Sequence, residues 1–258
     1  MTSERCAAWA TTTDMAGRST TLSAWLLHSR PFRDTSLLLD FLTLEQGRVS
    51  AIARGARTQK GKGRSTLQPF VSLRITLVGN HELRTLQAAE AAAPTLFLQG
   101  ERLFAGFYLN ELLVKLLHGH EPEPQVYQAY AEAIARLAAA DDVEPLLRNF
   151  ELRLLDALGY GLQFGHDAES GELLDGAGWY YLQPDSGFVR QLQAPMSESE
   201  ALRAGLYPGS ELLKIAAADY SCENTRRQAK RLLRQVLHQH LGGKDITSRQ
   251  LFARPEGQ

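Results

Sequence analysis

The first third of the chain alternates apolar and polar positions, which is the pattern of half-buried β-strands. Between Val71 and Leu77 every second side chain is apolar, while Ser72, Arg74 and Thr76 point to the opposite face. Weaker examples of this pattern occur at residues 22–29, 35–43, 48–54 and 83–88. Short strands separated by turn residues predict a small closed or nearly closed barrel, because closure removes exposed sheet edges. The strand count does not separate an oligonucleotide-binding-type (OB) barrel from an SH3-like one.

From residue 94 the apolar spacing changes to that of an α-helix. A wide apolar stripe between Leu103 and Leu117 predicts a helix of about five turns, which Gly119 ends. The same spacing predicts two further helices over 125–139 and 143–158. Because only a few residues connect these three helices, we expect them to form a bundle.

The last hundred residues combine a glycine-rich and aromatic-rich stretch with more helices. The turn at 185–187 predicts a β-hairpin between 179–182 and 188–192. Ser197 and Glu200 form a capping box at the start of a short helix. Further helices are expected near 210–217 and over 223–241.

The net charge of −1 conceals a basic, acidic and basic order along the chain. Residues 1–88 carry 12 Lys/Arg against 6 Asp/Glu, a net of +6. Residues 89–222 carry 8 against 20, a net of −12, and residues 223–258 carry 8 against 3, a net of +5. This order indicates that the two ends meet a polyanion and that the middle does not.

The first basic cluster occupies a glycine-rich strand connection. No acidic residue lies between its first and last members, which are Arg54, Arg57, Lys60, Lys62, Arg64 and Arg74. Such a segment suits a DNA or RNA backbone, because each neutralised phosphate releases a counterion; the alternative is a solvated loop. An ATP site is excluded because the P-loop pattern requires glycine where Ala56 stands and serine or threonine where Gly63 stands. In addition, a predicted strand follows this segment instead of the helix that would bind phosphate.

The second basic cluster lies on the predicted helix 223–241. Arg227, Lys230, Arg231 and Arg234 follow the spacing of one helix face, and Lys244 lies beyond the helix. Like charges at this spacing weaken an isolated helix, so the stripe favours an anionic partner. The alternative is neutralisation by the acidic middle of the chain.

Catalytic and metal-binding patterns are missing from the sequence. Cys6 and Cys222 make neither a disulfide framework nor a Cys-x-x-Cys motif, and the histidine pairs at 118/120 and 238/240 sit near helix ends, an ordinary placement. There is no Gly-x-Ser-x-Gly nucleophile motif. We therefore expect a binding protein, not an enzyme, with no catalytic residue, no metal and no cofactor. No signal peptide or membrane span is expected, so the setting is the cytoplasm.

Several segments in order resemble the bacterial recombination mediator family RecO. They are LLHSRPFRDTSLLL (26–39), EQGRV (45–49), ARGAR (53–57), LQPF (67–70), YLNELL (108–113), RNFEL (148–152), LGYG (158–161), LGGK (241–244) and SRQLF (248–252). The resemblance runs from about residue 22 to residue 252. Some family members carry a four-cysteine zinc site after the LGYG motif, but residues 161–190 contain no cysteine, so no zinc is predicted.

The resemblance implies an α+β protein of several modules. The expected segments are a flexible leader (1–20), an OB-fold barrel (21–92), a helical domain (93–159) and a C-terminal module (160–258) whose basic helix 223–241 packs on the helical domain. The C-terminal module resembles a zinc-finger region without the cysteines.

The resemblance also implies a function in DNA repair and homologous recombination. Such a protein binds single- and double-stranded DNA, anneals complementary strands and helps to load RecA onto DNA coated with single-strand-binding protein, usually with RecR. We expect a nucleoid-associated protein without membrane contact. The expected DNA-binding residues are Arg30, Arg48, Arg54, Arg57, Lys60, Lys62, Arg64, Arg74, Arg227, Lys230, Arg231, Arg234, Lys244 and Arg249.

The family also captures the acidic, Phe-terminated tail of single-strand-binding protein. We expect a pocket for this tail at Arg148, Phe150, Arg153 and Leu154, although Phe150 and Leu154 also fit a helix-bundle core. Three alternatives to the function stay open: an RNA-binding OB-fold protein, a metal-dependent nuclease that uses the acidic middle, and an adaptor without nucleic-acid contact.

Overall fold

A computed structural model describes residues 19–57, 66–79, 83–119, 121–139, 142–184 and 186–253. The chain forms two compact units: residues 1–127 together with 248–258, and residues 128–247. The expected leader lies outside the described residues up to residue 18, while Ser19 and Thr20 already belong to the first strand. The segment boundaries expected from the sequence stay a prediction.

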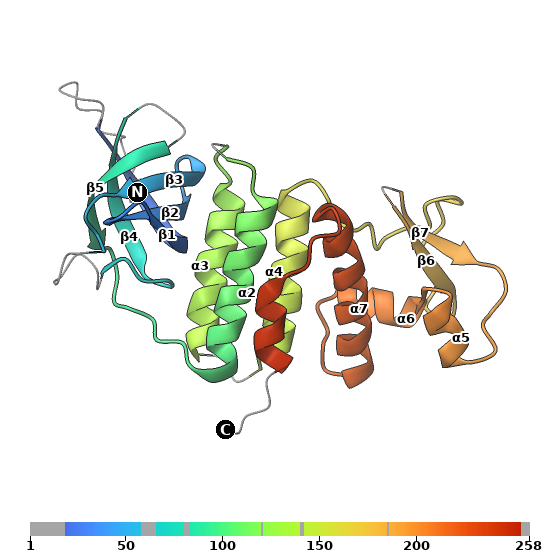
Figure 1. Cartoon of the computed structure of the whole chain (residues 1–258). Helices are drawn as coiled ribbons and strands as arrows, with labels where there is room; N and C mark the ends of the chain where they lie inside the picture. The colour runs from blue at the N-terminus through green and yellow to red at the C-terminus, as the bar shows by residue number, and fades with distance from the viewer. Residues whose placement is uncertain are drawn as a thin grey trace, which may run out of the picture. The chain divides into compact units, whose positions relative to one another are not determined.

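The first unit contains a closed five-stranded barrel, as the alternating pattern predicted (Figure 1). Its strands are β1 (Ser19–Phe32), β2 (Ser36–Thr43), β3 (Gly47–Ala53), β4 (Ser72–Val78) and β5 (Leu83–Ala91). The order around the barrel is β1-β2-β3-β5-β4, and every pair is antiparallel except the parallel pair β3–β5. The predicted fold class, an α+β protein with a barrel at its N-terminus, is confirmed.

Alternate side chains of the strands fill the barrel. Leu73, Ile75 and Leu77 are buried, together with Phe41 and Val49 from the neighbouring strands. Burying an aliphatic or aromatic side chain of this size stabilises a fold by about 1.5–3 kcal/mol. The regular alternation along β4 therefore fixes which face of the strand points inward.

The tight connection from β2 to β3 depends on a glycine. The Thr43 hydroxyl donates to the carbonyl of Gly47 at 2.8 Å and accepts from the backbone N–H of Gln46. Gly47 has a φ of 62°, and a Cβ atom there would lie 1.8 Å from the Glu121 carbonyl oxygen. Only glycine fits this close approach without strain.

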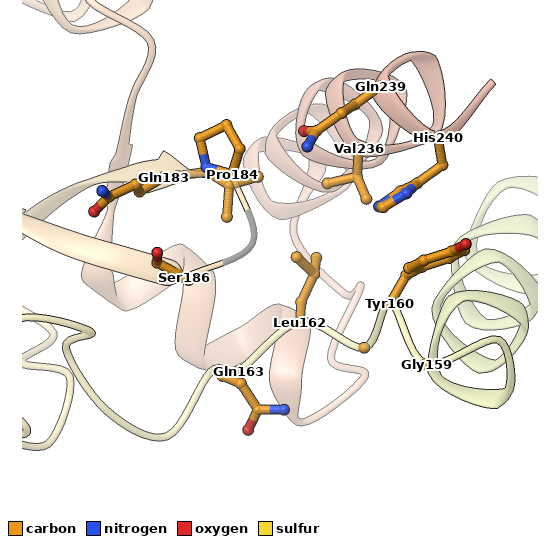
Figure 2. A pocket seen from close by; sticks show the side chains of 13 residues that line it. Gly159, Tyr160, Leu162, Gln163, Gln183, Pro184, Ser186, Val236, Gln239 and His240 are labelled. Carbon is orange, nitrogen blue, oxygen red and sulfur yellow. The ribbon is translucent and has the colours of Figure 1, made fainter. Parts of the chain in front are cut away.

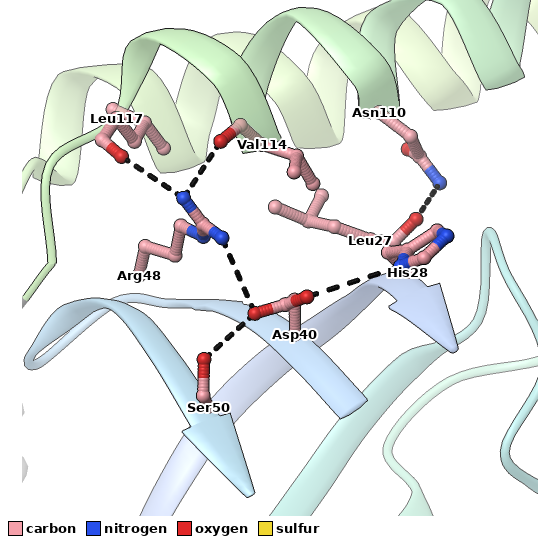
Figure 3. A network of polar contacts seen from close by, with 8 residues as sticks. All are labelled: Leu27, His28, Asp40, Arg48, Ser50, Asn110, Val114 and Leu117. Carbon is pink, nitrogen blue, oxygen red and sulfur yellow. Dashed lines mark hydrogen bonds and ion pairs between the residues drawn. The ribbon is translucent and has the colours of Figure 1, made fainter. Parts of the chain in front are cut away.

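Helix α2 (Gly100–Leu116) packs against the barrel in the same unit. The buried side-chain amide of Asn110 donates to the carbonyl of Leu27 in β1 at 2.9 Å (Figure 3). The 3₁₀-helix η1 (Thr247–Ala253) returns to α2, where the backbone N–H of Ser248 donates to Glu111 at 2.7 Å. Residues far apart in sequence thus complete the first unit.

The second unit contains helices and one small sheet. Helix α3 (Pro124–Ala139) enters it from the first unit, and α4 (Val143–Ala157) packs on α7 (Glu223–His240). Asp142 caps α4 by accepting from the N–H of Glu144. The sheet has the order β7-β6-β8.

The predicted hairpin is confirmed as β6 (Trp179–Gln183) and β7 (Gly187–Gln191). Strand β8 (Leu206–Pro208) was not predicted, because three residues are too few to show alternation. Helices α5 (Glu198–Arg203) and α6 (Gly209–Ala216) flank β8, and Ser197 caps α5 as expected.

Residues 161–190 are held together by a buried carboxylate. Asp167 accepts three backbone N–H bonds, from Glu169 at 2.9 Å, Ser170 at 2.7 Å and Arg190 at 2.6 Å. These hydrogen bonds, first of all the one from Ser170, lower the pKa of Asp167 although burial opposes the shift. In this cysteine-free region the Asp167 carboxylate joins its own turn to strand β7.

Candidate nucleic-acid interface

The turn between β1 and β2 and the end of β3 meet at one rim of the barrel. Strand register sets Ala53 opposite Leu37, and Leu37 opposite Pro31. The backbone N–H of Arg57 donates to the carbonyl of Thr35 at 3.0 Å. The same side of the barrel therefore carries the β1–β2 turn and the chain that leaves β3.

The Arg57 guanidinium strengthens this rim. Its Nη1 donates to the carbonyls of Arg33 and Asp34, at 3.1 Å and 3.0 Å. Arg33 has a φ of 51° and its guanidinium lies 5.3 Å from the centroid of the Phe32 ring. The turn is thus held in place, with a cation stacked near an aromatic ring.

Four exposed arginines form what we call the rim cluster: Arg30, Arg33, Arg54 and Arg57. In the described part of the chain, no carboxylate forms an ion pair with any of the four. Unpaired cations on one side of a small barrel create a positive potential that attracts a polyanion. The predicted cations Lys60, Lys62 and Arg64 follow Arg57 in the chain and lie outside the described residues.

Arg48 lies elsewhere and holds the barrel on α2 (Figure 3). Its Nη1 donates to the carbonyls of Val114 at 2.6 Å and Leu117 at 3.3 Å, and its Nη2 lies 3.3 Å from Asp40. The largely buried Asp40 carboxylate also accepts from the Ser50 hydroxyl at 2.7 Å. A cation at the carbonyl end of a helix stabilises the helix. These contacts therefore give Arg48 a structural role.

Two further predicted cations do not join the rim cluster. Arg74 is exposed on β4, where it is paired in register with Ser23 of β1 and Glu90 of β5. Ser23 lies seven positions before Arg30, which is about 23 Å along the strand. Arg249 lies with its guanidinium 5.6 Å from the centroid of the Tyr108 ring, where η1 meets α2.

Two of the four cations in the basic stripe of α7, and the neighbouring Arg226, pair with carboxylates of the second unit. Arg226 pairs with Asp142 at 2.9 Å, Lys230 pairs with Glu144 at 3.1 Å, and Arg227 pairs with Glu198. These partners come from the acidic middle of the chain, which was the alternative that the sequence left open.

Arg231 also faces the protein rather than the solvent. Its guanidinium lies 3.8 Å from the Tyr207 ring centroid and donates to the Leu206 carbonyl, and burial lowers its pKa. Among the described residues, no carboxylate pairs with the two exposed cations Arg234 and Lys244.

The expected tail pocket falls in the helical core. Phe150 and Leu154 are 2% and 0% exposed, and Arg148 is buried beside Glu151 at 3.0 Å. Arg153 alone is on the surface, where it pairs with Glu132 at 2.5 Å. The burial of the two apolar side chains weighs against an open pocket at these four positions, and the pocket stays a prediction.

Phe32 and Arg33 belong to the rim, although sequence reasoning did not single them out. The signal that could have identified them is their position in the turn between two predicted strands, where a cation follows an aromatic residue. In the described segments, no group of three or more His, Cys, Asp or Glu residues could hold a metal ion. None of the described helices is long and apolar enough to cross a membrane.

Comparison with known proteins covers both units. Residues 15–95 match the family described as recombination protein O N terminal, and residues 98–250 match recombination protein O C terminal. The DNA repair protein RecO of Pseudomonas putida (strain W619) is 43% identical over 229 residues, which cover 89% of this chain and 95% of the relative. The proteins of the same name from Pseudomonas aeruginosa (strain LESB58) and Methylococcus capsulatus are also 43% identical, covering 89% of this chain and 93% and 91% of the relatives.

Proposed function

Because the chain belongs to the recombination protein O (RecO) family, whose role is in DNA repair and recombination, we propose that it binds single- and double-stranded DNA and anneals complementary strands. In this proposal it also assists the loading of RecA onto DNA coated with single-strand-binding protein, together with RecR. It acts without catalysis and without a cofactor, and it associates with the nucleoid.

The observation that carries the proposal is the rim cluster. Arg30, Arg33, Arg54 and Arg57 are exposed and form no ion pair with a described carboxylate. A DNA backbone supplies the missing negative charge, and the released counterions make its binding favourable. Lys60, Lys62 and Arg64 extend the same charge along the chain, so we propose that they act with the rim cluster.

Contacts of this kind position DNA without reading its sequence, because they are made to phosphates. Two strands held with their charges screened approach each other more easily, which speeds annealing without ATP. The exposed Arg234 and Lys244 are the α7-side cations that we propose as further contacts. We assign no DNA contact to Arg48, Arg231 or Arg249, whose guanidinium groups contact the protein itself.

The test is a strand-annealing assay with complementary DNA coated by single-strand-binding protein. It compares the wild type with the variant Arg30→Glu/Arg54→Glu and with the control Arg136→Glu/Arg203→Glu, which makes the same charge change at two exposed positions of the second unit. We expect the rim variant to anneal at least about tenfold more slowly than the control, since fewer phosphates are neutralised. Equal rates for the wild type and the rim variant would instead favour an adaptor without DNA contact.

A further inference from the structure

A cavity of about 350 Å³ opens in the second unit (Figure 2). Three segments line it: the chain that follows α4, the turn between β6 and β7, and the last turn of α7. Its volume lies at the lower end of the range of small-ligand pockets, roughly 300–1,000 Å³. The cavity therefore suits one flat group rather than a folded peptide.

One wall of the cavity is a stacked aromatic pair. The rings of Tyr160 and His240 lie 3.9 Å apart between centroids, with 19° between their planes. Tyr160 remains 42% exposed despite this stack, so part of its ring is accessible to a ligand. The outer face of a ring in this stack is a preformed planar surface on which another ring can stack.

The rest of the lining is apolar or amide in character. Figure 2 shows Leu162 pointing into the space below Val236 and Pro184, with the Gln239 amide at the upper edge. The described lining contains no carboxylate, lysine or arginine. It thus provides van der Waals contact and neutral hydrogen-bonding groups, which suit an uncharged ring with polar edges.

Helix ends further restrict the ligand. The cavity lies just beyond the end of α4, at Gly159–Tyr160, and at the last turn of α7, at Gln239–His240. The carbonyl end of a helix carries partial negative charge, which disfavours an anion and favours hydrogen-bond donors. An acidic peptide or a phosphate group is therefore a poor occupant, whereas a base with an exocyclic amino group is a good one.

We propose that this cavity binds a nucleobase of single-stranded DNA, with its ring stacked on an outer face of the Tyr160–His240 pair and its amino edge toward the helix ends. The inference rests on the proposed function, because it takes DNA as the ligand. It adds a second contact of different chemistry: the rim cluster attracts phosphates, while this cavity holds a base. Adenine, cytosine and guanine, which carry exocyclic amino groups, fit it better than thymine.

The experiment compares two oligomers of equal length and charge, an oligo(dA) and an abasic sugar-phosphate chain, by fluorescence anisotropy with the full chain. Four proteins are measured: the wild type, Tyr160→Ala, Ser186→Trp and the control Tyr160→Phe. Ser186 is exposed in the β6–β7 turn and lines the cavity, so tryptophan there fills the space without disturbing the core. Tyr160→Phe keeps the ring.

We expect the wild type to bind oligo(dA) about fivefold or more tightly than the abasic chain, because each stacked base contributes to affinity. This preference falls at least about threefold in Tyr160→Ala and Ser186→Trp and persists in Tyr160→Phe, while affinity for the abasic chain stays the same in all four. If Tyr160→Ala does not fold, the preference of Ser186→Trp for oligo(dA) over the abasic chain tests the proposal alone.

An unchanged preference in Ser186→Trp overturns the base-binding assignment and leaves the proposed function standing. A wild type that binds both oligomers equally also overturns the assignment, because the bases then add no affinity. A wild type that binds neither oligomer overturns the assignment and the proposed function together.

Discussion

The guanidinium of Arg48 in β3 donates a hydrogen bond of 2.6 Å to the carbonyl oxygen of Val114 in α2 (Figure 3). The same side chain lies beside Asp40, so one cation serves both a helix end and a barrel carboxylate. We predict that Arg48→Ala lowers the free energy of unfolding by about 2 kcal/mol, because Asp40 and the carbonyls lose a charged donor. Urea denaturation measures this change.

Arg54→Ala is the matched control for that variant, since Arg54 follows the same strand but is exposed. We expect it to change stability by less than about 0.5 kcal/mol and to weaken DNA binding instead. If Arg48→Ala kept full stability and lost more DNA affinity than Arg54→Ala, the structural assignment of Arg48 would be wrong.

The carboxylate of Asp167 predicts a pH-dependent stability. Its pKa is lowered in the folded state, so it stabilises the fold above the ordinary carboxylate pKa, and this contribution is lost as pH falls through the lowered value. Asp167→Asn is therefore expected to cost about 1–3 kcal/mol at pH 7, because three N–H donors lose a charged acceptor.

Thermal unfolding at pH 7 and at pH 3 checks the Asp167 prediction. The difference between the wild type and Asp167→Asn should be smaller at pH 3, which lies below the ordinary carboxylate pKa of 3.8, because the unfolded chain takes up a proton there and the advantage of the charged folded form decreases. Glu172→Gln, at an exposed carboxylate in the same region, should show no such difference at either pH. If the wild type and Asp167→Asn differed in stability by the same amount at both pH values, the role assigned to the Asp167 charge would be wrong.

The buried pair Arg148–Glu151 predicts different outcomes for two arginines of one helix. Arg148→Ala leaves the buried Glu151 carboxylate without this cation, and we expect it to lower the free energy of unfolding by about 3 kcal/mol. Arg153→Glu changes an exposed ion pair and should cost less than about 1 kcal/mol.

Peptide binding to Arg153→Glu, which should fold like the wild type, then tests the expected tail pocket. If this position rims the pocket, an acidic peptide that ends in phenylalanine binds the variant more weakly, as isothermal titration measures. Binding equal to that of the wild type would remove Arg153 from the pocket.

Local pattern predicted the elements of this fold well. The alternation from Val71 to Leu77 identified β4 because one face of that strand is buried in the barrel. The third predicted helix, 143–158, is found as Val143–Ala157 because its apolar stripe, its Asp cap and its terminal glycine agree. The number of short strands predicted a closed or nearly closed barrel, and the barrel is closed.

Pairing between distant residues could not be predicted in the same way. The cations of α7 meet Asp142, Glu144 and Glu198, and no local pattern indicates which carboxylate a lysine or arginine will contact. Likewise, Arg48 and Arg54 look like equivalent basic residues in the sequence. Only the docking of α2 on the barrel separates the first, which is structural, from the second, which is exposed.

The central claim is that the rim cluster binds the DNA backbone, and the salt dependence of binding tests it most directly. For a 20-nucleotide single strand, the slope of log K against log salt decreases by about 0.7 for each phosphate that the protein no longer neutralises. We predict a steep slope for the wild type and for Arg136→Glu/Arg203→Glu, and a slope shallower by about 1.4 for Arg30→Glu/Arg54→Glu. The same slope for all three proteins, or a flat dependence in the wild type, would contradict the claim.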